Sequence, residues 1–237
     1  MTDTTNIQDH APEFELQALL EAGCHFGHQA SKWHPKMKSY IYMEKDGVHI
    51  FDLEQTAAQL KAAYNVAYDL GKSGKTLVIV GTKKQARESI LDISQTNKVP
   101  YIVSRWLGGL LTNWDQVQKS LKRMLQIEEG LKTDKFKNYT KYERLQLEKE
   151  MSRLKRFFEG IRELKNKPDA LFVIDLNKEK NAVTEAAATG VFTMGVVDSN
   201  ANPDAVDLVI PSNDDGKAAV HYVISQVVAG YIAGKSA

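Results

Sequence analysis

The sequence predicts an α/β fold: a doubly wound parallel sheet (Rossmann-like or flavodoxin-like) with an inserted antiparallel coiled-coil helical hairpin. Short runs rich in β-branched residues recur along the chain, and amphipathic helical segments separate them, which predicts the sheet. A long stretch without strand-like runs but with heptad spacing predicts the hairpin. The 237 residues, 43% of them hydrophobic, suffice for one core domain with an appendage.

The first elements are a short helix, a loop and a hairpin. Residues 13–22 have the spacing of an amphipathic helix, and a polar, aromatic and basic loop follows them. Strand-like runs at 40–43 and 48–51 flank the pair Asp46-Gly47. This pair favours a tight hairpin turn, because glycine accepts a positive φ at no steric cost.

The parallel sheet is predicted from five apolar runs with helices between them. Asp52 suits the N-cap of a helix that reaches about residue 70, because its side-chain oxygen can accept a hydrogen bond from the first turn. Strands are predicted at 76–80, 100–104, 170–175, 191–197 and 207–211. Further helices are predicted at 83–96, 179–189 and 216–232, so that strands and helices alternate.

Residues 112–167 interrupt this alternation. Their apolar residues are spaced three and four apart, as in the seam of a coiled coil: Trp114, Val117, Leu121 and Met124, then Leu147, Met151, Leu154, Phe158 and Ile161. Thr140 and Glu143 form a capping-box pattern at the start of the second helix. We therefore predict an antiparallel hairpin that projects as an arm, with two ordinary helices lying on the sheet as the alternative.

These elements divide the chain into four segments. We predict a flexible acidic tail at 1–12, a discontinuous α/β domain at 13–111 and 168–233, the coiled-coil hairpin at 112–167 and a C-terminal tail at 234–237.

The net charge of +1 is unevenly distributed. Residues 1–22 carry a net charge of −5, residues 23–167 carry +11 and residues 168–237 carry −5. A basic segment of this size attracts a polyanion from beyond contact range. We expect the basic middle to face nucleic acid and the acidic ends to face solvent or protein; a solvated surface without such a partner is the alternative.

Basic, imidazole and aromatic side chains gather in the loop after the first helix and in the turn that follows the first parallel strand. The loop's lysines suit phosphates, which position a protein on nucleic acid without reading its sequence. The turn after Gly81 opens a helix, whose free N–H groups suit a phosphate of RNA or of a small ligand; a plain strand–helix turn is the alternative. The candidate RNA-binding residues are His25, His28, Lys32, Trp33, Lys36, Lys38, Lys83, Lys84, Arg105, Lys155 and Arg156. Trp106 and Trp114 are interpreted as anchors for the base of the arm, with stacking of Trp106 on a base as the alternative.

The sequence offers one weak metal candidate, the cluster Cys24, His25 and His28, whose spacing matches no closed zinc site. We expect no zinc there and no catalytic role. Four acids lie near strand ends, where α/β enzymes place catalytic groups, but no base or nucleophile pairs with them in a recognisable spacing: Asp175, Asp198, Asp204 and Asp207.

The single cysteine excludes a disulfide framework, and no apolar run approaches the length of a membrane span. The N-terminal residues resemble neither a secretory signal nor a transit peptide, so we expect a cytoplasmic protein.

Five segments in this order resemble the bacterial form of the small-subunit ribosomal protein two family: 19–37, 80–86, 104–114, 168–190 and 196–216. The resemblance covers about residues 13–233. Three features depart from the family: Cys24 replaces a usually aliphatic residue, residues 163–169 lack the glycine pair that is common before Pro168, and residues 1–12 have no counterpart.

This resemblance implies a doubly wound domain with an inserted hairpin, and a structural constituent of the small ribosomal subunit that acts in translation. It implies binding to small-subunit ribosomal RNA and support for the docking of ribosomal protein one, beside other small-subunit proteins. It implies no enzyme activity, no membrane partner, no homo-oligomer in the ribosome and no cofactor beyond the Mg of the rRNA environment. A nucleotide- or sugar-phosphate-handling enzyme on a Rossmann-like fold is the alternative, because function lies in sites rather than in folds.

Overall fold

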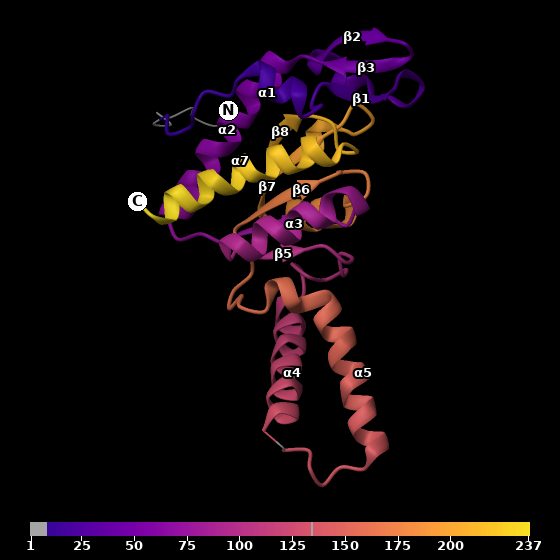
Figure 1. The fold of residues 1–237 in the computed structure, drawn as a ribbon, viewed down its shortest axis with the longest axis vertical. Helices are drawn as coiled ribbons and strands as arrows, with labels where there is room; N and C mark the ends of the chain where they lie inside the picture. The colour runs from indigo at the N-terminus through magenta and orange to yellow at the C-terminus, as the bar shows by residue number, and fades with distance from the viewer. Residues whose placement is uncertain (1–8, 134) are drawn as a thin grey trace.

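A five-stranded parallel sheet lies between layers of helices, and a pair of helices projects from this body as an arm (Figure 1). The structure is a computed structural model, and it describes residues 9–133 and 135–237. The predicted α/β class is confirmed. Among the described helices, none is long and apolar enough to cross a membrane.

The parallel sheet consists of β4 (Leu77–Val80), β5 (Tyr101–Ile102), β6 (Ala170–Ile174), β7 (Phe192–Val197) and β8 (Leu208–Pro211). Its order is β5-β4-β6-β7-β8, and each neighbouring pair is parallel. Numbered along the chain, this is the 2-1-3-4-5 order of flavodoxin-like sheets. The order reverses between β4 and β6, so the loops after these two strands bound the crevice where such sheets bind ligands.

Two apolar layers cover the faces of the sheet. Leu77 and Ile79 face one core together with α1 (Leu16–Glu21), α2 (Leu53–Lys72), α3 (Lys84–Asn97) and α7 (Lys217–Lys235). Val78 and Val80 face the other, with α6 (Lys180–Thr189) and the base of the arm. All four strand residues are buried, as expected for a strand covered on both sides.

The backbones of α2 and α7 approach closely because glycines lie at their contact. A Cβ on Gly230 would lie 2.6 Å from the Tyr64 carbonyl oxygen, and one on Gly234 would overlap the carbonyl oxygen of Tyr68. The predicted cap of α2 is present: the Asp52 side chain accepts a hydrogen bond from the Glu54 amide at 3.0 Å.

A second, antiparallel sheet has the order β1-β3-β2 and consists of β1 (Phe26–Gln29), β2 (Ile41–Lys45) and β3 (Val48–Phe51). The predicted hairpin turn is confirmed, with positive φ at both Asp46 and Gly47. Strand β1 lies where a loop was predicted. Its side chains are half-buried or exposed and carry no apolar alternation, so its pairing with β3 leaves no local trace in the sequence. Two short 3-10 helices, Ala30–Lys32 and Pro35–Tyr40, connect β1 to β2.

The arm consists of α4 (Trp114–Lys132) and α5 (Lys141–Phe158), followed by a 3-10 turn at Glu159–Ile161. The side chains of Leu121, Met124 and Phe158 are buried and belong to the apolar core that Val78 and Val80 face. Between the helices, Glu128 accepts hydrogen bonds from Lys155 at 2.8 Å and from Arg162 at 3.0 Å. These cationic partners lower the pKa of Glu128 to about 2 against the opposing effect of burial.

The predicted capping box at the start of α5 is present. The Glu143 amide donates to the Thr140 hydroxyl at 3.3 Å, and the Thr140 amide donates to the Glu143 carboxylate at 2.8 Å.

Residues 9–12, predicted as part of a flexible tail, lie against α2. Asp9 pairs with Lys61 at 2.6 Å, and the His10 ring stacks on Tyr68 with centroids 4.0 Å apart. Residues 1–8 of that predicted tail lie outside the described residues.

Candidate functional site

The crevice at the carboxyl edge of the sheet holds a half-buried cation among carboxylates. Lys83, which precedes α3, places its Nζ 2.6 Å from Asp214, 2.7 Å from Asp215 and 3.3 Å from Asp175. Asp175 follows β6 and has a positive φ of 67°, while Asp214 and Asp215 follow β8. The loops after β6 and β8 therefore converge on the ammonium group of Lys83, which lies in the loop after β4.

His28 of β1 extends this cluster. Its Nδ1 lies 2.9 Å from Asp198, and its Nε2 lies 3.3 Å from Asp215. Asp198 also accepts from the amides of His28 and Ser199, at 3.1 and 2.6 Å. The small sheet is thus tied to the end of β7 through polar contacts that the sequence spacing did not reveal.

The groups in this cluster shift one another's protonation. Burial, reinforced by the carboxylates of Asp198 and Asp175, raises the pKa of Asp214 to about 7. The hydrogen bond to Asp198 raises the pKa of His28 despite partial burial. Burial opposes the charge of Lys83, but its bonds to Asp214 and Asp215 outweigh that effect and raise its pKa.

The cluster suits a cation better than a phosphate. Within the described part of the chain, ligand atoms of His28, Asp198 and Asp214 lie within 4.8 Å of one another, as in a metal-binding group. The ammonium group of Lys83 already binds Asp214, so a divalent cation would compete with it. A phosphate would meet the carboxylates of Asp175 and Asp215, and the Lys83 side chain is not available to it.

The metal candidate from the sequence, Cys24 with His25 and His28, does not form such a group of ligand atoms. Cys24 is fully buried, and burial raises the pKa of its thiol to about 11. Its neighbour His25 lies beside Phe26, with ring centroids 4.0 Å apart, and burial lowers the pKa of its imidazole. His28 instead faces Asp198.

The loop between β1 and β2 presents its four predicted RNA-binding residues to solvent. Lys32, Trp33, Lys36 and Lys38 are all exposed. Lys36 forms an ion pair with Asp204. The Trp33 ring stacks on buried His49, with centroids 5.3 Å apart and an interplanar angle of 21°.

The remaining predicted residues fall into two groups. Lys84, Arg105 and Arg156 are exposed. Lys155 is half-buried and bound to Glu128, so its charge serves the contact between α4 and α5.

A carboxylate that the sequence analysis missed organises the loop before the arm. Glu185 of α6 accepts hydrogen bonds from the amides of Gly109 at 2.7 Å and Leu111 at 3.0 Å, and from Trp106 Nε1 at 3.3 Å. Trp106 is 5% exposed, which agrees with its predicted role as an anchor. The sequence signal for Glu185 is weak, because 76 residues separate it from Gly109.

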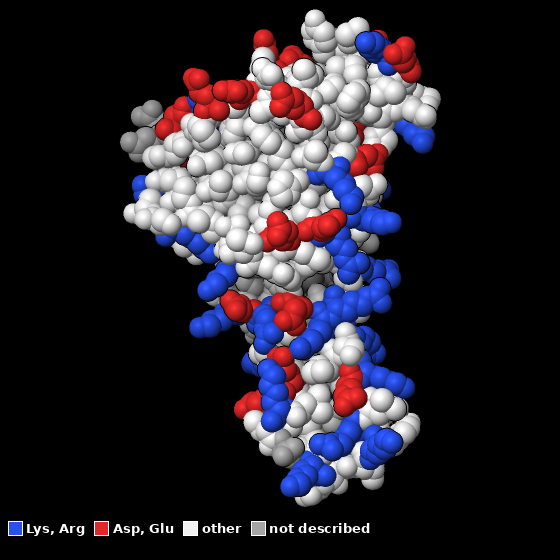
Figure 2. Space-filling model, in the orientation of Figure 1, with Lys and Arg blue, Asp and Glu red and all other residues white. Residues whose placement is uncertain are grey.

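In the view of Figure 2, basic side chains are the most numerous charged groups on the arm. Several acidic side chains gather at the opposite end of the molecule, where Figure 1 shows α1 and α2. The acidic C-terminal segment does not simply face solvent as predicted: Asp204, Asp207 and Asp215 are exposed, but Asp198 and Asp214 are 1% exposed and paired internally.

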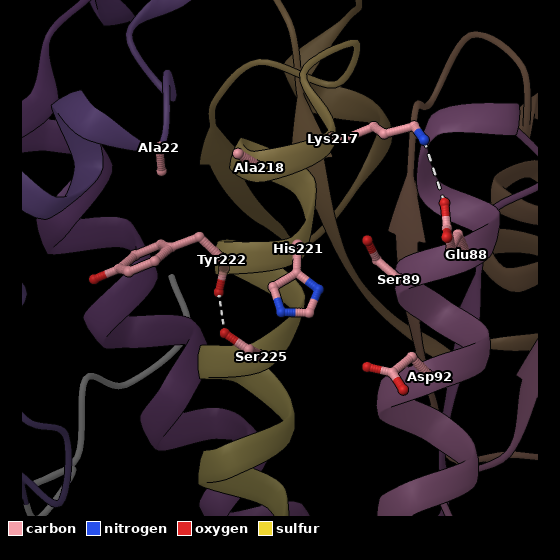
Figure 3. A pocket seen from close by; sticks show the side chains of 9 residues that line it. All are labelled: Ala22, Glu88, Ser89, Asp92, Lys217, Ala218, His221, Tyr222 and Ser225. Carbon is pink, nitrogen blue, oxygen red and sulfur yellow. Dashed lines mark hydrogen bonds and ion pairs between the residues drawn. The ribbon is translucent and has the colours of Figure 1, made fainter.

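A cavity of about 630 Å³ lies between α3 and α7 (Figure 3). His221 of α7 faces Ser89 and Asp92 of α3 across it, and Lys217 pairs with Glu88 at 3.2 Å. Its walls carry both signs of charge, so the cavity has no marked preference for an anion.

Comparison with known proteins gives one consistent family. A sequence profile described as "Ribosomal protein S2" matches residues 19–234. Two curated proteins named "Small ribosomal subunit protein uS2", from Rhizobium meliloti (strain 1021) and Sinorhizobium medicae (strain WSM419), are similar to this chain. Each is 44% identical over 209 residues, which cover 88% of this chain and 82% of the relative.

Proposed function

Because this chain belongs to the ribosomal protein S2 family, we propose that it is a structural component of the small ribosomal subunit in translation, where it binds the subunit's RNA and supports the docking of ribosomal protein one. The observation that carries the proposal is the family match over residues 19–234, together with 44% identity to small-subunit proteins over most of the chain.

The exposed basic residues support the RNA contact. Lys32, Trp33, Lys36 and Lys38 share one loop, while Lys84, Arg105 and Arg156 add charge on the α/β domain and the arm. Lysine and arginine side chains position a protein by contacting phosphates. Lys83 and Lys155 instead serve internal ion pairs, so the proposed interface consists of the exposed members of the predicted set.

The enzyme alternative would need a site in the crevice between β4 and β6. There the ammonium group of Lys83 lies against three carboxylates of the chain itself. This arrangement repels the phosphates that such an enzyme would handle, and it favours the structural role.

Binding to small subunits depleted of this protein tests the RNA contact. We expect the double variant Lys32→Glu with Lys38→Glu to bind more weakly. We also expect a slope of log K against log salt that is shallower by about 2, since each phosphate contact contributes about 0.9. The matched control is Lys75→Glu with Lys98→Glu, two exposed lysines that precede β4 and β5 at the opposite edge of the sheet. Equal binding by the two double variants would remove this loop from the interface.

Cross-linking in assembled subunits, with probes placed at Lys84, Arg105 and Asp207, tests whether the basic residues face RNA while the acidic C-terminal segment faces solvent or protein. RNA adducts are expected from at least one of the two basic positions. Protein adducts, or none, are expected from Asp207, because a carboxylate repels phosphate. Predominant RNA adducts from Asp207 would contradict this division.

A further inference from the structure

Residues 135–140, which lead into α5 at the tip of the arm, pack against the end of α4. The ring of Phe136 covers Gly130, where any Cβ would overlap it. The Tyr139 ring packs against Phe136, with centroids 5.0 Å apart and an interplanar angle of 58°. The capping box at Thr140 then starts α5. Tyr139 thus lies between Phe136 and the start of α5, and its side chain is 46% exposed.

Tyr139 lines a groove of about 710 Å³ between the end of α4 and the first turns of α5. Leu145 and Met151 give it apolar surface, Lys141 and Arg144 give it positive charge, and Glu148 is its one acid. A volume of this size accommodates a drug-sized ligand, which is the size range of a nucleotide. The groove thus offers an aromatic ring, apolar walls and two cations together.

The charge of the tip points to a polyanion. Residues 135–145 carry four Lys or Arg and one acid, Glu143, whose carboxylate is engaged by Thr140. Lys135, Lys137, Lys141 and Arg144 form no ion pair with any described residue, in contrast to Arg123 and Lys155 nearer the body. Figure 2 shows basic side chains gathered at this far end of the arm.

We propose that the groove at the tip of the arm binds an unpaired nucleotide of the small-subunit RNA, with its base stacked on Tyr139 and its phosphates held by Lys141 and Arg144. This inference rests on the proposed RNA-binding function and adds a site absent from the predicted set.

The chemistry favours an unpaired nucleotide over a duplex. In an A-form helix the faces of the bases are stacked on one another, so a side chain can stack only on a base that has left the helix. Stacking on an aromatic ring is independent of sequence, and it stabilises binding enough for a single substitution to be measured. An acidic protein partner would be held by Lys141 and Arg144 but would gain little from an aromatic ring in an open groove.

The first experiment measures binding of full-length variants to small subunits depleted of this protein. We expect Tyr139→Ala to weaken binding by about tenfold, the loss typical of one stacked base. Tyr139→Phe keeps the ring and is expected to bind like the wild type. Tyr142→Ala is the matched control, because Tyr142 is 69% exposed on the same turn and does not line the groove.

The outcomes separate this inference from the function on which it rests. If the wild type does not bind the subunits, the proposed function fails. If the wild type binds and Tyr139→Ala binds equally well, the proposed function stands and the site at the tip is refuted.

A second experiment identifies the occupant. Asn138→Cys introduces an exposed thiol beside the groove, while the native Cys24 is fully buried and does not compete for a maleimide-linked photo-cross-linker. Cross-links to RNA in reassembled subunits, at nucleotides outside base pairs, are expected. Cross-links to protein, or to paired nucleotides, would overturn the proposal.

Discussion

Lys83 donates a hydrogen bond to Asp214, with Nζ and Oδ1 2.6 Å apart, and this contact joins the start of α3 to the loop after β8. Asp214 is 1% exposed, and the pair lies at the centre of the polar cluster that holds the small sheet on the large one. Removal of Lys83 would leave the carboxylate of Asp214 buried without its cation, which is strongly destabilising.

The protonation of Asp214 makes the stability of the fold depend on pH. Its folded-state pKa of about 7 lies above the ordinary value of 3.8, so the folded chain retains a proton that the unfolded chain loses. The resulting stabilisation is present below about pH 4 and is lost as pH rises through 7. The raised pKa of His28 acts in the same direction. We expect the free energy of unfolding, measured with urea, to be lower at pH 8 than at pH 5 by more than about 1 kcal/mol.

The variant Asp214→Asn separates this contribution, because an amide has no proton to lose in this range. Its free energy of unfolding should change less between pH 5 and pH 8 than that of the wild type. A wild-type protein that became more stable between these pH values would contradict the assignment.

The apolar contact at the base of the arm can be tested at Phe158, which is 6% exposed. Phe158→Ala should lower the free energy of unfolding by about 3–5 kcal/mol, because it removes a buried ring and leaves a cavity. Leu125→Ala, on an α4 side chain that is 38% exposed, serves as the control and should lose less than about 1 kcal/mol. Equal losses in urea unfolding would mean that Phe158 does not anchor the arm.

The cap of α5 can be tested at Thr140. Thr140→Ala removes the hydroxyl that accepts from the Glu143 amide and should destabilise the helix by about 1 kcal/mol. Hydrogen exchange should then speed up in the first turn of α5 and stay unchanged in α2. Thr133→Ala is the control, since the Thr133 hydroxyl donates to the Glu129 carbonyl at the end of α4. Faster exchange in the first turn of α5 in this control would mean that the effect does not depend on the cap at Thr140.

The hydrogen bonds of Glu185 to the loop before the arm predict that two substitutions at this position lower the free energy of unfolding by different amounts. Glu185→Ala leaves the amides of Gly109 and Leu111 without their acceptor and should cost about 2–3 kcal/mol. Glu185→Gln retains one carbonyl oxygen and should lie between the wild type and the alanine variant. Urea unfolding followed by tryptophan fluorescence measures both, and an unchanged alanine variant would show that water replaces the carboxylate at no cost.

The sequence predicted correctly those structural features that depend on interactions between residues close together in the chain. The cap at Asp52, the capping box at Thr140 and the turn at Asp46-Gly47 each follow from side chains and backbone within one turn, and all three are present. Strand β1 was missed because its hydrogen bonds are made with β3, about twenty residues away, and its own residues show no alternation. Strand β5 spans two of the five expected residues, since β4 is its one strand neighbour in the sheet.

The candidate site was less predictable, because charge in a sequence does not reveal its partner. Lys83 stands beside Lys84 in the sequence, yet Asp214, 131 residues away, binds one of them while the other is exposed. The groove at Tyr139 forms only when Gly130, Phe136 and the start of α5 pack together, so no local pattern in the sequence predicts it.

The contact between α2 and α7 also limits which mutations the gene can tolerate. Every single-base change of a glycine codon that yields another amino acid introduces a Cβ. At Gly230 and Gly234 that Cβ would meet the carbonyl oxygens of Tyr64 and Tyr68, which cannot turn away without unwinding α2. Both codons are therefore fixed by the spacing of two helices rather than by any partner, and an unvarying residue at either position would say nothing about binding.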